Sequence, residues 1–142
     1  MNKAVKKTIS WVVYLLILAG LIWGIPRGLS YVLRTDYPMA SITSGSMWPS
    51  LKQGDLVFIK GYVDKEDVQK GDIIVYKNYI GFTIHRVVEL NEYTVTTKGD
   101  ANRGPDSPIE YDDIVGKAVS YNGKPIRVPL IGNISILINK NI

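Results

Sequence analysis

The stretch Asp72-Ile-Ile-Val-Tyr-Lys77, followed after four residues by Phe82-Thr-Ile-His-Arg-Val-Val-Glu89, decides the fold class of this 142-residue chain. Both segments are short, rich in β-branched and aromatic residues, and begin directly after a glycine. Such runs between turn residues are typical of β-strands. Similar runs recur at 55–60, 93–97 and 114–121, and the last of these precedes the hairpin dipeptide Asn122-Gly123. The regular spacing predicts a mainly β domain, a small barrel-like or sandwich structure.

Two other segments of this domain have a less regular pattern. Residues 64–69 favour a single helical turn, and no other segment of the domain shows a sustained helical period. Residues 128–138 are apolar but too short to cross a bilayer, and they contain Gly132 and Asn133. We expect either a final strand or a segment that lies on the membrane surface.

Residues 8–26 form an uncharged apolar run near the N-terminus. The run is about as long as the ~20 residues that a helix needs to cross a bilayer. A cleaved signal peptide and a buried helix of a soluble protein are the alternatives. The run is longer than the apolar core of a signal peptide, and no A-x-A-like cleavage site follows it. These features favour a retained anchor.

The basic residues beside the run predict its orientation. Lys3, Lys6 and Lys7 precede it, whereas only Arg27 and Arg34 follow it closely. Positive charge favours the cytoplasmic side of a membrane. We therefore predict a single-pass protein of the cell membrane, with a cytoplasmic N-terminus at 1–7, a transmembrane anchor at 8–26 and an extracytoplasmic β domain at 27–142.

Composition excludes several functions. The chain has no cysteine, so disulfides, thiol catalysis and thiolate metal sites are excluded. The formal net charge is +4, but no basic stripe carries interleaved aromatic residues, so we expect no nucleic-acid partner. We also expect no metal and no cofactor.

The segment Ser41-Ile-Thr-Ser44-Gly45-Ser46-Met47-Trp48-Pro49-Ser50 is a candidate nucleophile loop. A serine hydroxyl becomes nucleophilic when a base takes its proton, and the oxyanion that forms needs hydrogen-bond donors. Gly45 leaves room for a substrate strand, and Ser44 would lie on the same side as Ser46 if the segment is extended. Seen alone, the segment also fits an ordinary serine-rich turn.

His85 is the only histidine of the chain, and imidazole is the side chain that titrates near neutral pH. Strand alternation places Thr83, His85 and Val87 on one face and Arg86 on the other. Asp100 and Asp106 follow in a loop dense in turn residues, and a carboxylate that orients the histidine is what a Ser-His pair needs. A lone strand histidine or loop aspartate is usually structural, so only the combination is informative.

Together these segments resemble signal peptidase I, in the Ser-His branch of archaea and the endoplasmic reticulum. The order and spacing of four segments carry the resemblance, which covers residues 41–121 and the anchor. The segments are Ser44-Gly45-Ser46-Met47-Trp48-Pro49 with Gly54-Asp55-Leu56-Val57, Gly71-Asp72-Ile73-Ile74-Val75-Tyr76, His85-Arg86, and Gly99-Asp100-Ala101-Asn102 with Asp106. Trp48 stands where many members have Glu. Many members also have a C-terminal membrane span, which the short apolar run at 128–138 does not match.

The resemblance implies a signal-peptidase-type β domain and a role for each site residue. Ser46 would be the nucleophile, His85 the general base, Asp106 the acidic member and Asp100 a supporting carboxylate. Ser44 would join the Ser46 amide as an oxyanion donor. The implied substrates are secretory preproteins with small residues at positions −1 and −3, which lie extended along an exposed strand. The implied partners are these preproteins and the lipid bilayer, with the translocation machinery as a further candidate.

Two other functions are compatible with the sequence. A related membrane protease would share the site and cut other clients, and a membrane-anchored β module would have no activity. Met47 and Trp48 put two large apolar side chains directly after Ser46. We also hypothesise that Trp48 contacts the membrane surface, because tryptophan favours that depth. The alternative is that Trp48 packs into the domain core.

Overall fold

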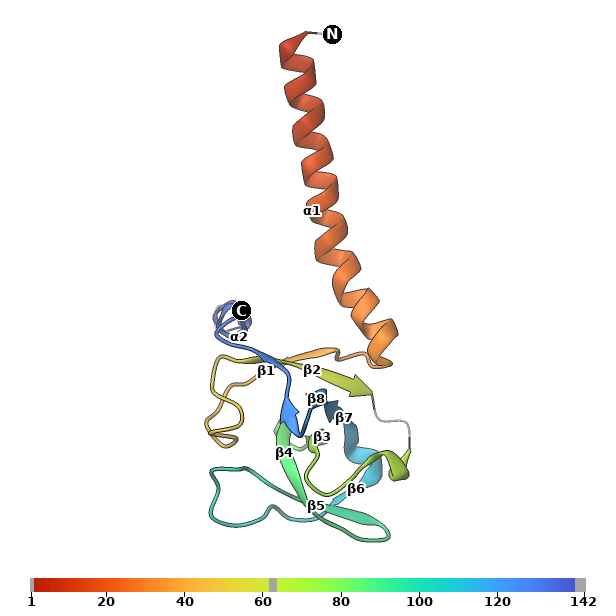
Figure 1. Ribbon diagram of the computed structural model, residues 1–142, viewed down its shortest axis with the longest axis vertical. Helices are drawn as coiled ribbons and strands as arrows, with labels where there is room; N and C mark the ends of the chain where they lie inside the picture. The colour runs from red at the N-terminus through yellow and green to blue at the C-terminus, as the bar shows by residue number, and fades with distance from the viewer. Residues whose placement is uncertain (1, 62–63, 140–142) are drawn as a thin grey trace.

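The computed structural model describes residues 2–61 and 64–139. Its N-terminal helix α1, Lys3–Leu33, stands away from a β domain that contains the rest of the chain (Figure 1). No residue of α1 is buried, and the helix is long and apolar enough to cross a membrane. The helix continues through Pro26 and ends where Arg34 takes a left-handed conformation. Proline is tolerated inside membrane-spanning helices, so Pro26 need not end the helix. The helix extends beyond both ends of the predicted span at 8–26.

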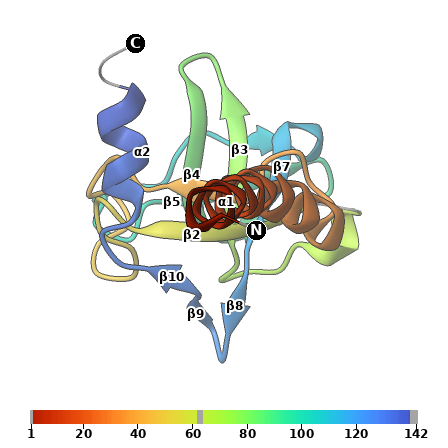
Figure 2. The same cartoon turned by 90° about the horizontal axis from the view of Figure 1, so that it is seen from above.

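The β domain is built mainly from short antiparallel strands. In chain order the elements are β1 Met39–Ser41, β2 Leu56–Gly61, the 3-10 turn η1 Lys65–Asp67, β3 Ile73–Asn78, β4 Gly81–Leu90, β5 Thr94–Lys98, β6 Ile109–Glu110, the 3-10 turn η2 Tyr111–Asp113, β7 Ile114–Ala118, β8 Ser120–Tyr121, β9 Lys124–Pro125, β10 Arg127–Val128 and the helix α2 Gly132–Asn139. The main sheet has the order β1-β2-β7-β3-β4-β5-β6, and β10 also pairs with β2. Figure 2 shows the projecting β3–β4 hairpin and the small β8–β9 hairpin at opposite sides of the domain.

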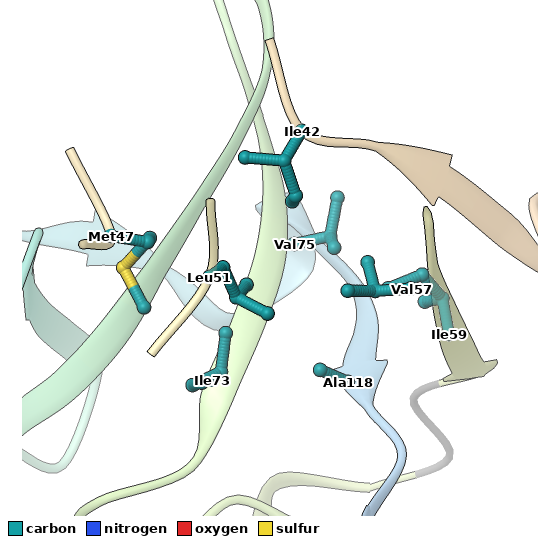
Figure 3. Packing of buried hydrophobic residues seen from close by; sticks show 8 residues of the cluster. All are labelled: Ile42, Met47, Leu51, Val57, Ile59, Ile73, Val75 and Ala118. Atoms are coloured by element: carbon teal, nitrogen blue, oxygen red, sulfur yellow. The ribbon is translucent and has the colours of Figure 1, made fainter. Parts of the chain in front are cut away.

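Strand β3 separates two hydrophobic clusters. Ile73 and Val75 belong to one cluster, whereas Ile74 and Tyr76 belong to the other. Because successive side chains of a strand point to opposite faces, β3 is covered on both faces. Figure 3 shows the first cluster, in which Met47 approaches the same core as Val57 and Ala118, which come from β2 and β7 respectively.

The predicted mainly β fold is confirmed. Each of the predicted strand segments contains a strand of the structure, η1 lies inside the predicted helical turn, and Asn122-Gly123 forms the β8–β9 hairpin with positive φ at both residues. Within the described ranges no pairing joins β1 to β6, so the sheet is open and not a closed barrel.

The prediction for 128–138 is corrected in one respect. Only Val128 belongs to a strand, and Gly132–Asn139 is a helix, so a final strand over this segment is wrong. A short apolar run is ambiguous between helix and strand because its period cannot be resolved.

Candidate active site

The nucleophile loop connects β1 to β2 and is held by its own apolar residues. Met47 and Leu51 have no exposed surface and pack into the first cluster. The amide of Trp48 donates to the carbonyl of Gly45 at 3.0 Å, and the amide of Leu51 donates to that of Met47 at 2.9 Å. These turns fix the backbone directly after Ser46. Trp48 itself is 58% exposed, so the alternative that it packs into the domain core is wrong.

Ser46, His85 and Asp106 form a continuous hydrogen-bonded chain. The Ser46 Oγ lies 3.1 Å from the Nε2 of His85, and the His85 Nδ1 lies 2.6 Å from the Oδ2 of Asp106. The imidazole is buried in strand β4, whereas the Asp106 carboxylate is partly exposed in the loop after β5. The structure therefore brings together Ser46, His85 and Asp106, the residues for which the family resemblance implies the roles of nucleophile, base and acid.

Two buried residues hold the Asp106 carboxylate. The Thr97 hydroxyl donates to the Asp106 Oδ2 at 2.6 Å, and the Tyr76 hydroxyl donates to the same oxygen at 3.4 Å. The Asp106 amide also donates to the Thr97 carbonyl at 2.8 Å. Burial raises the pKa of the Tyr76 phenol, so it stays a neutral donor. This oxygen therefore accepts from three side chains, which fixes the carboxylate toward His85.

Sequence reasoning missed Thr97 and Tyr76. Strand pairing places Val87 of β4 opposite Thr97 of β5. It also places His85 opposite Ile74 of β3, and Tyr76 lies two residues further along β3, on the same face as Ile74. The side chains of Thr97, Tyr76 and His85 thus share one face. The available signal was alternation in three strands, but it needed the pairing register, which a single sequence does not show.

Asp100 lies on the opposite face of β4, with Arg86. The Arg86 guanidinium donates from Nε and Nη2 to the two carboxylate oxygens of Asp100, at 2.8 Å each. Arg86 also donates to the Ser50 hydroxyl at 3.1 Å and to the Gly71 carbonyl at 2.9 Å. The hydrogen bonds from Arg86 lower the pKa of the Asp100 carboxyl, and the Asp100 carboxylate in turn raises the pKa of Arg86.

The Asp100 loop also contacts the nucleophile directly. The Ala101 amide donates to the Ser46 carbonyl at 2.8 Å, and a Cβ on Gly99 would lie 2.8 Å from the same carbonyl oxygen. Only a glycine therefore fits this close approach. Asp100 is the carboxylate partner of Arg86, which also contacts Ser50, and the same loop is hydrogen-bonded to the Ser46 carbonyl.

The Ser44 hydroxyl reaches the nucleophile in a way that differs from the prediction. Its Oγ lies 3.1 Å from the Ser46 Oγ. The segment is not extended here, because Ser44 lies in a bend and Ser46 begins a turn. The two hydroxyls meet because the backbone folds at Gly45, where an added Cβ would face open space.

A groove of about 350 Å³ ends at the hydroxyl of Ser46 and the ring of His85. One wall is β1 with the residues that follow it, and the other is β4. The other residues that line the groove are Ala40, Ser41, Ile42, Thr43, Ser44, Val75, Phe82, Thr83, Ile84 and Asn102. Apart from Phe82 and Asn102, these are aliphatic side chains and small hydroxyl side chains.

Comparison with known proteins identifies the family. This chain is 32% identical over 130 residues to the signal peptidase complex catalytic subunit SEC11 of Colletotrichum graminicola. The aligned region covers 80% of this chain and 71% of that protein. The corresponding subunits of Sclerotinia sclerotiorum and Zygosaccharomyces rouxii are 32% and 30% identical, and 81% of this chain is covered in each case. The chain belongs to the family of signal peptidase catalytic subunits. No protein-family model matches the sequence.

Membership of the signal peptidase family confirms the predicted resemblance. The chain covers 71–74% of the length of these three signal peptidase subunits. Ser44, Ser46, His85 and Asp106 come together in the structure, whereas Asp100 forms a separate ion pair behind them.

Proposed function

We propose that this signal peptidase is a serine peptidase that removes signal peptides from secretory preproteins, with Ser46 as nucleophile and His85 as general base. The observation that carries the proposal is the 3.1 Å contact between the Ser46 Oγ and the His85 Nε2. This is within the distance at which a base can take a hydroxyl proton. Relatives of the chain are named as signal peptidase catalytic subunits, which supports the substrate class.

The proposed reaction proceeds in two halves. The Ser46 Oγ attacks the carbonyl carbon of the scissile bond, while the His85 Nε2 takes the hydroxyl proton. As the C–N bond breaks, the imidazolium returns this proton to the leaving amine, and the signal peptide remains as an ester on Ser46. A water molecule then attacks the ester, His85 takes its proton, and the proton passes to the Ser46 Oγ as the ester bond breaks.

Asp106 and Ser44 support this chemistry in different ways. Asp106 accepts from the His85 Nδ1, which leaves the Nε2 lone pair directed at Ser46 and stabilises the imidazolium that forms. Ser44 lies beside the nucleophile, where its hydroxyl can donate to the oxyanion together with the Ser46 amide. The proposal needs no metal and no cofactor.

The groove supports an extended substrate with small side chains. In the described sheet β1 pairs on one side with β2 and is the first strand of the order, so its other edge is open. An extended peptide can add to such an edge through main-chain hydrogen bonds, with alternate side chains in the groove. We therefore propose that the preprotein segment before the cleavage site pairs with β1, and that its residues at −1 and −3, which are small, lie in the groove beside Ser46.

The proposed location follows from the lysines in the first turns of α1, before its apolar run. Lys3, Lys6 and Lys7 favour a cytoplasmic N-terminus, so the β domain lies on the extracytoplasmic side. Substrates that emerge from the translocation machinery are delivered to the same side, which makes that machinery a candidate partner. Membrane tethering raises the effective concentration of enzyme and substrate on one surface.

The direct test compares Ser46→Ala with wild type, both purified in detergent and mixed with a model preprotein. Loss of the nucleophile should abolish cleavage and leave the fold intact. Ser107→Ala is a matched control, because Ser107 is exposed in the Asp106 loop. Appreciable cleavage by folded, protease-free Ser46→Ala protein would show that Ser46 is not the nucleophile. A folded wild-type chain that cleaves nothing favours a module without catalysis, and one that cleaves other membrane proteins favours a protease with different clients.

The exposed side chain of Trp48 stays a proposed membrane contact. Trp48 is the largest apolar side chain exposed in the nucleophile loop. In the full chain with Trp11→Phe and Trp23→Phe, lipid vesicles should shift the remaining tryptophan emission to shorter wavelength relative to a mild detergent of low headgroup density. The additional Trp48→Phe variant is the control for background. A Trp48 emission that brominated lipids do not quench would contradict the contact.

A further inference from the structure

The C-terminal helix α2 presents a large apolar surface. Leu130, Ile131 and Ile134 are 69%, 50% and 61% exposed, and residues 129–139 contain no charged side chain. Three large aliphatic side chains are thus exposed within five residues of the chain, and large apolar side chains exposed together mark interaction sites. We therefore expect these residues to bind another apolar surface.

The position of α2 identifies the chemistry of that surface. Figure 1 shows α2 end-on, on the same side of the sheet as α1 and beside the lower part of α1. Figure 2 shows α2 beside α1 when the domain is seen along α1, so α2 runs across the direction of the membrane helix. Helix α1 continues for residues 27–33 beyond its apolar run, which is about 10 Å at 1.5 Å per residue. A helix beside this part of α1 lies at the depth of lipid headgroups.

The start of α2 packs closely against the end of the nucleophile loop, directly before β2. A Cβ on Gly132 would lie 2.5 Å from the Asp55 carbonyl oxygen, so the helix begins in close contact with the loop before β2. The Arg127 guanidinium donates to the buried Asp55 carboxylate at 2.7 Å. The Asp55 carbonyl in turn accepts from the Ile42 amide at 2.9 Å, and Ile42 lines the groove. The orientation of α2 is therefore tied to the orientation of the groove.

We propose that α2 and the turn before it lie in the lipid headgroup region as a second membrane contact, which sets the tilt of the β domain relative to the bilayer. One helix alone leaves a domain free to swivel about its point of attachment. A second contact, held to the groove through Asp55, keeps the groove at a constant height and angle above the lipid. Apolar helices that lie in the interface bury one face about 5–10 Å deep.

Site-specific fluorescence tests the contact without requiring catalysis. The chain has no cysteine, so Ile134→Cys introduces one labelling site for an environment-sensitive fluorophore. Tyr93→Cys is the control, because Tyr93 is 75% exposed and directly precedes β5, at the end of the domain remote from α1 (Figure 1). Both are made in the full chain with Ser46→Ala and placed in nanodiscs, one copy per disc. The failure of this test is therefore independent of the proposed peptidase activity.

The expected result is blue-shifted Ile134→Cys emission that headgroup-labelled quencher lipids reduce by about half, with no change for Tyr93→Cys, since the interfacial depth is ~5–10 Å. Equal, weak quenching at both positions would overturn the contact. Shielding of the Ile134→Cys label that appears only at two copies per disc would also overturn it, because it assigns the surface to a second chain.

A second measurement tests the tilt and rests on the proposed function. Ile131→Gln with Ile134→Gln should slow cleavage of a membrane-embedded preprotein about tenfold, the change that corresponds to ~1.4 kcal/mol. Cleavage of a short soluble peptide should be unchanged, and Tyr93→Gln should change neither rate. Equal losses with both substrates would overturn the role in tilt.

Discussion

His85 and Arg86 are neighbours on β4, and each of them holds a different carboxylate from the same loop. His85 faces Asp106 through one hydrogen bond of 2.6 Å, on the side of Ser46 Oγ and Thr97. Arg86 faces Asp100 through two hydrogen bonds of 2.8 Å, on the other side of the strand. The first pair contacts the Ser46 hydroxyl, whereas the second contacts the Ser50 hydroxyl and the Gly71 carbonyl.

The two pairs differ in what a proton can do. An imidazole can accept a proton at one ring nitrogen while it donates from the other, so the His85 pair can take part in proton transfer. A guanidinium keeps its protons at all ordinary pH values and offers a rigid fork to a carboxylate. Strand alternation therefore gives two adjacent residues different surroundings. His85 faces Ser46 and Asp106, whereas Arg86 faces Asp100 and Ser50.

The largest expected effect separates the two carboxylates by activity. Asp106→Asn keeps the shape of the side chain but removes the charge that orients His85, so turnover should fall by about 10⁴-fold. Asp100→Asn should reduce turnover by about tenfold or less, since it weakens two charge-assisted hydrogen bonds outside the reacting chain. Initial rates with a model preprotein measure both. A near wild-type Asp106→Asn protein beside an inactive Asp100→Asn protein would reverse the two roles.

A smaller effect separates them by stability and pH. The Arg86 hydrogen bonds hold the pKa of the Asp100 carboxyl below its ordinary value, so protons bind the unfolded chain first as the pH falls. The stabilisation is complete above about pH 5 and is lost as the pH falls through the folded-state pKa. Asp100→Asn should lower the free energy of unfolding at pH 7 by about 1–3 kcal/mol, the typical contribution of hydrogen bonds to charged groups.

Denaturant unfolding at several pH values between 2.5 and 7 measures this effect. The free energy of unfolding should fall less steeply with acid in Asp100→Asn than in wild type. Asp112→Asn is the control, because Asp112 is exposed in η2. Parallel curves for wild type and Asp100→Asn would show that the Arg86 pair does not stabilise the fold.

The smallest effect concerns Thr97, which acts only through Asp106. Thr97→Val removes the hydroxyl that donates to Asp106 at 2.6 Å and keeps the buried shape, so kcat should fall about tenfold, the loss expected for ~1.4 kcal/mol. Thr97→Ser should retain most of the activity because it keeps the donor. KM should change little in both variants. Equal rates for the Val and Ser variants would assign Thr97 to packing alone.

Strand alternation predicted the opposite faces of His85 and Arg86 correctly, because β4 is partly solvated and its two faces meet different surroundings. Alternation is not visible at 73–76 of β3, where four consecutive residues are buried, since both faces of this strand are covered. The assignment of Asp106 to His85 came from the family resemblance. Spacing within a turn-rich loop cannot show which of two carboxylates faces which side of a neighbouring strand.

Other parts of the site depend on contacts that no local pattern records. Thr97 and Tyr76 reach Asp106 only through the registers of β3, β4 and β5. Helix α2 was unpredictable because an apolar run of this length fits helix and strand equally. The approach of Ser44 to Ser46 was predicted for the wrong reason, since a bend and not an extended segment brings the hydroxyls together.

Ser46, His85 and Asp106 come from segments that are distant in the sequence, and this affects how the site forms as the chain folds. Ser46 and His85 are 39 residues apart, and His85 and Asp106 are 21 residues apart. Contacts at such separations form late, after the loops between them have closed. A chain that has not yet paired β4 with β5 lacks the loop that brings Asp106 to His85. The site that we propose for signal-peptide cleavage is therefore complete only once the sheet has formed.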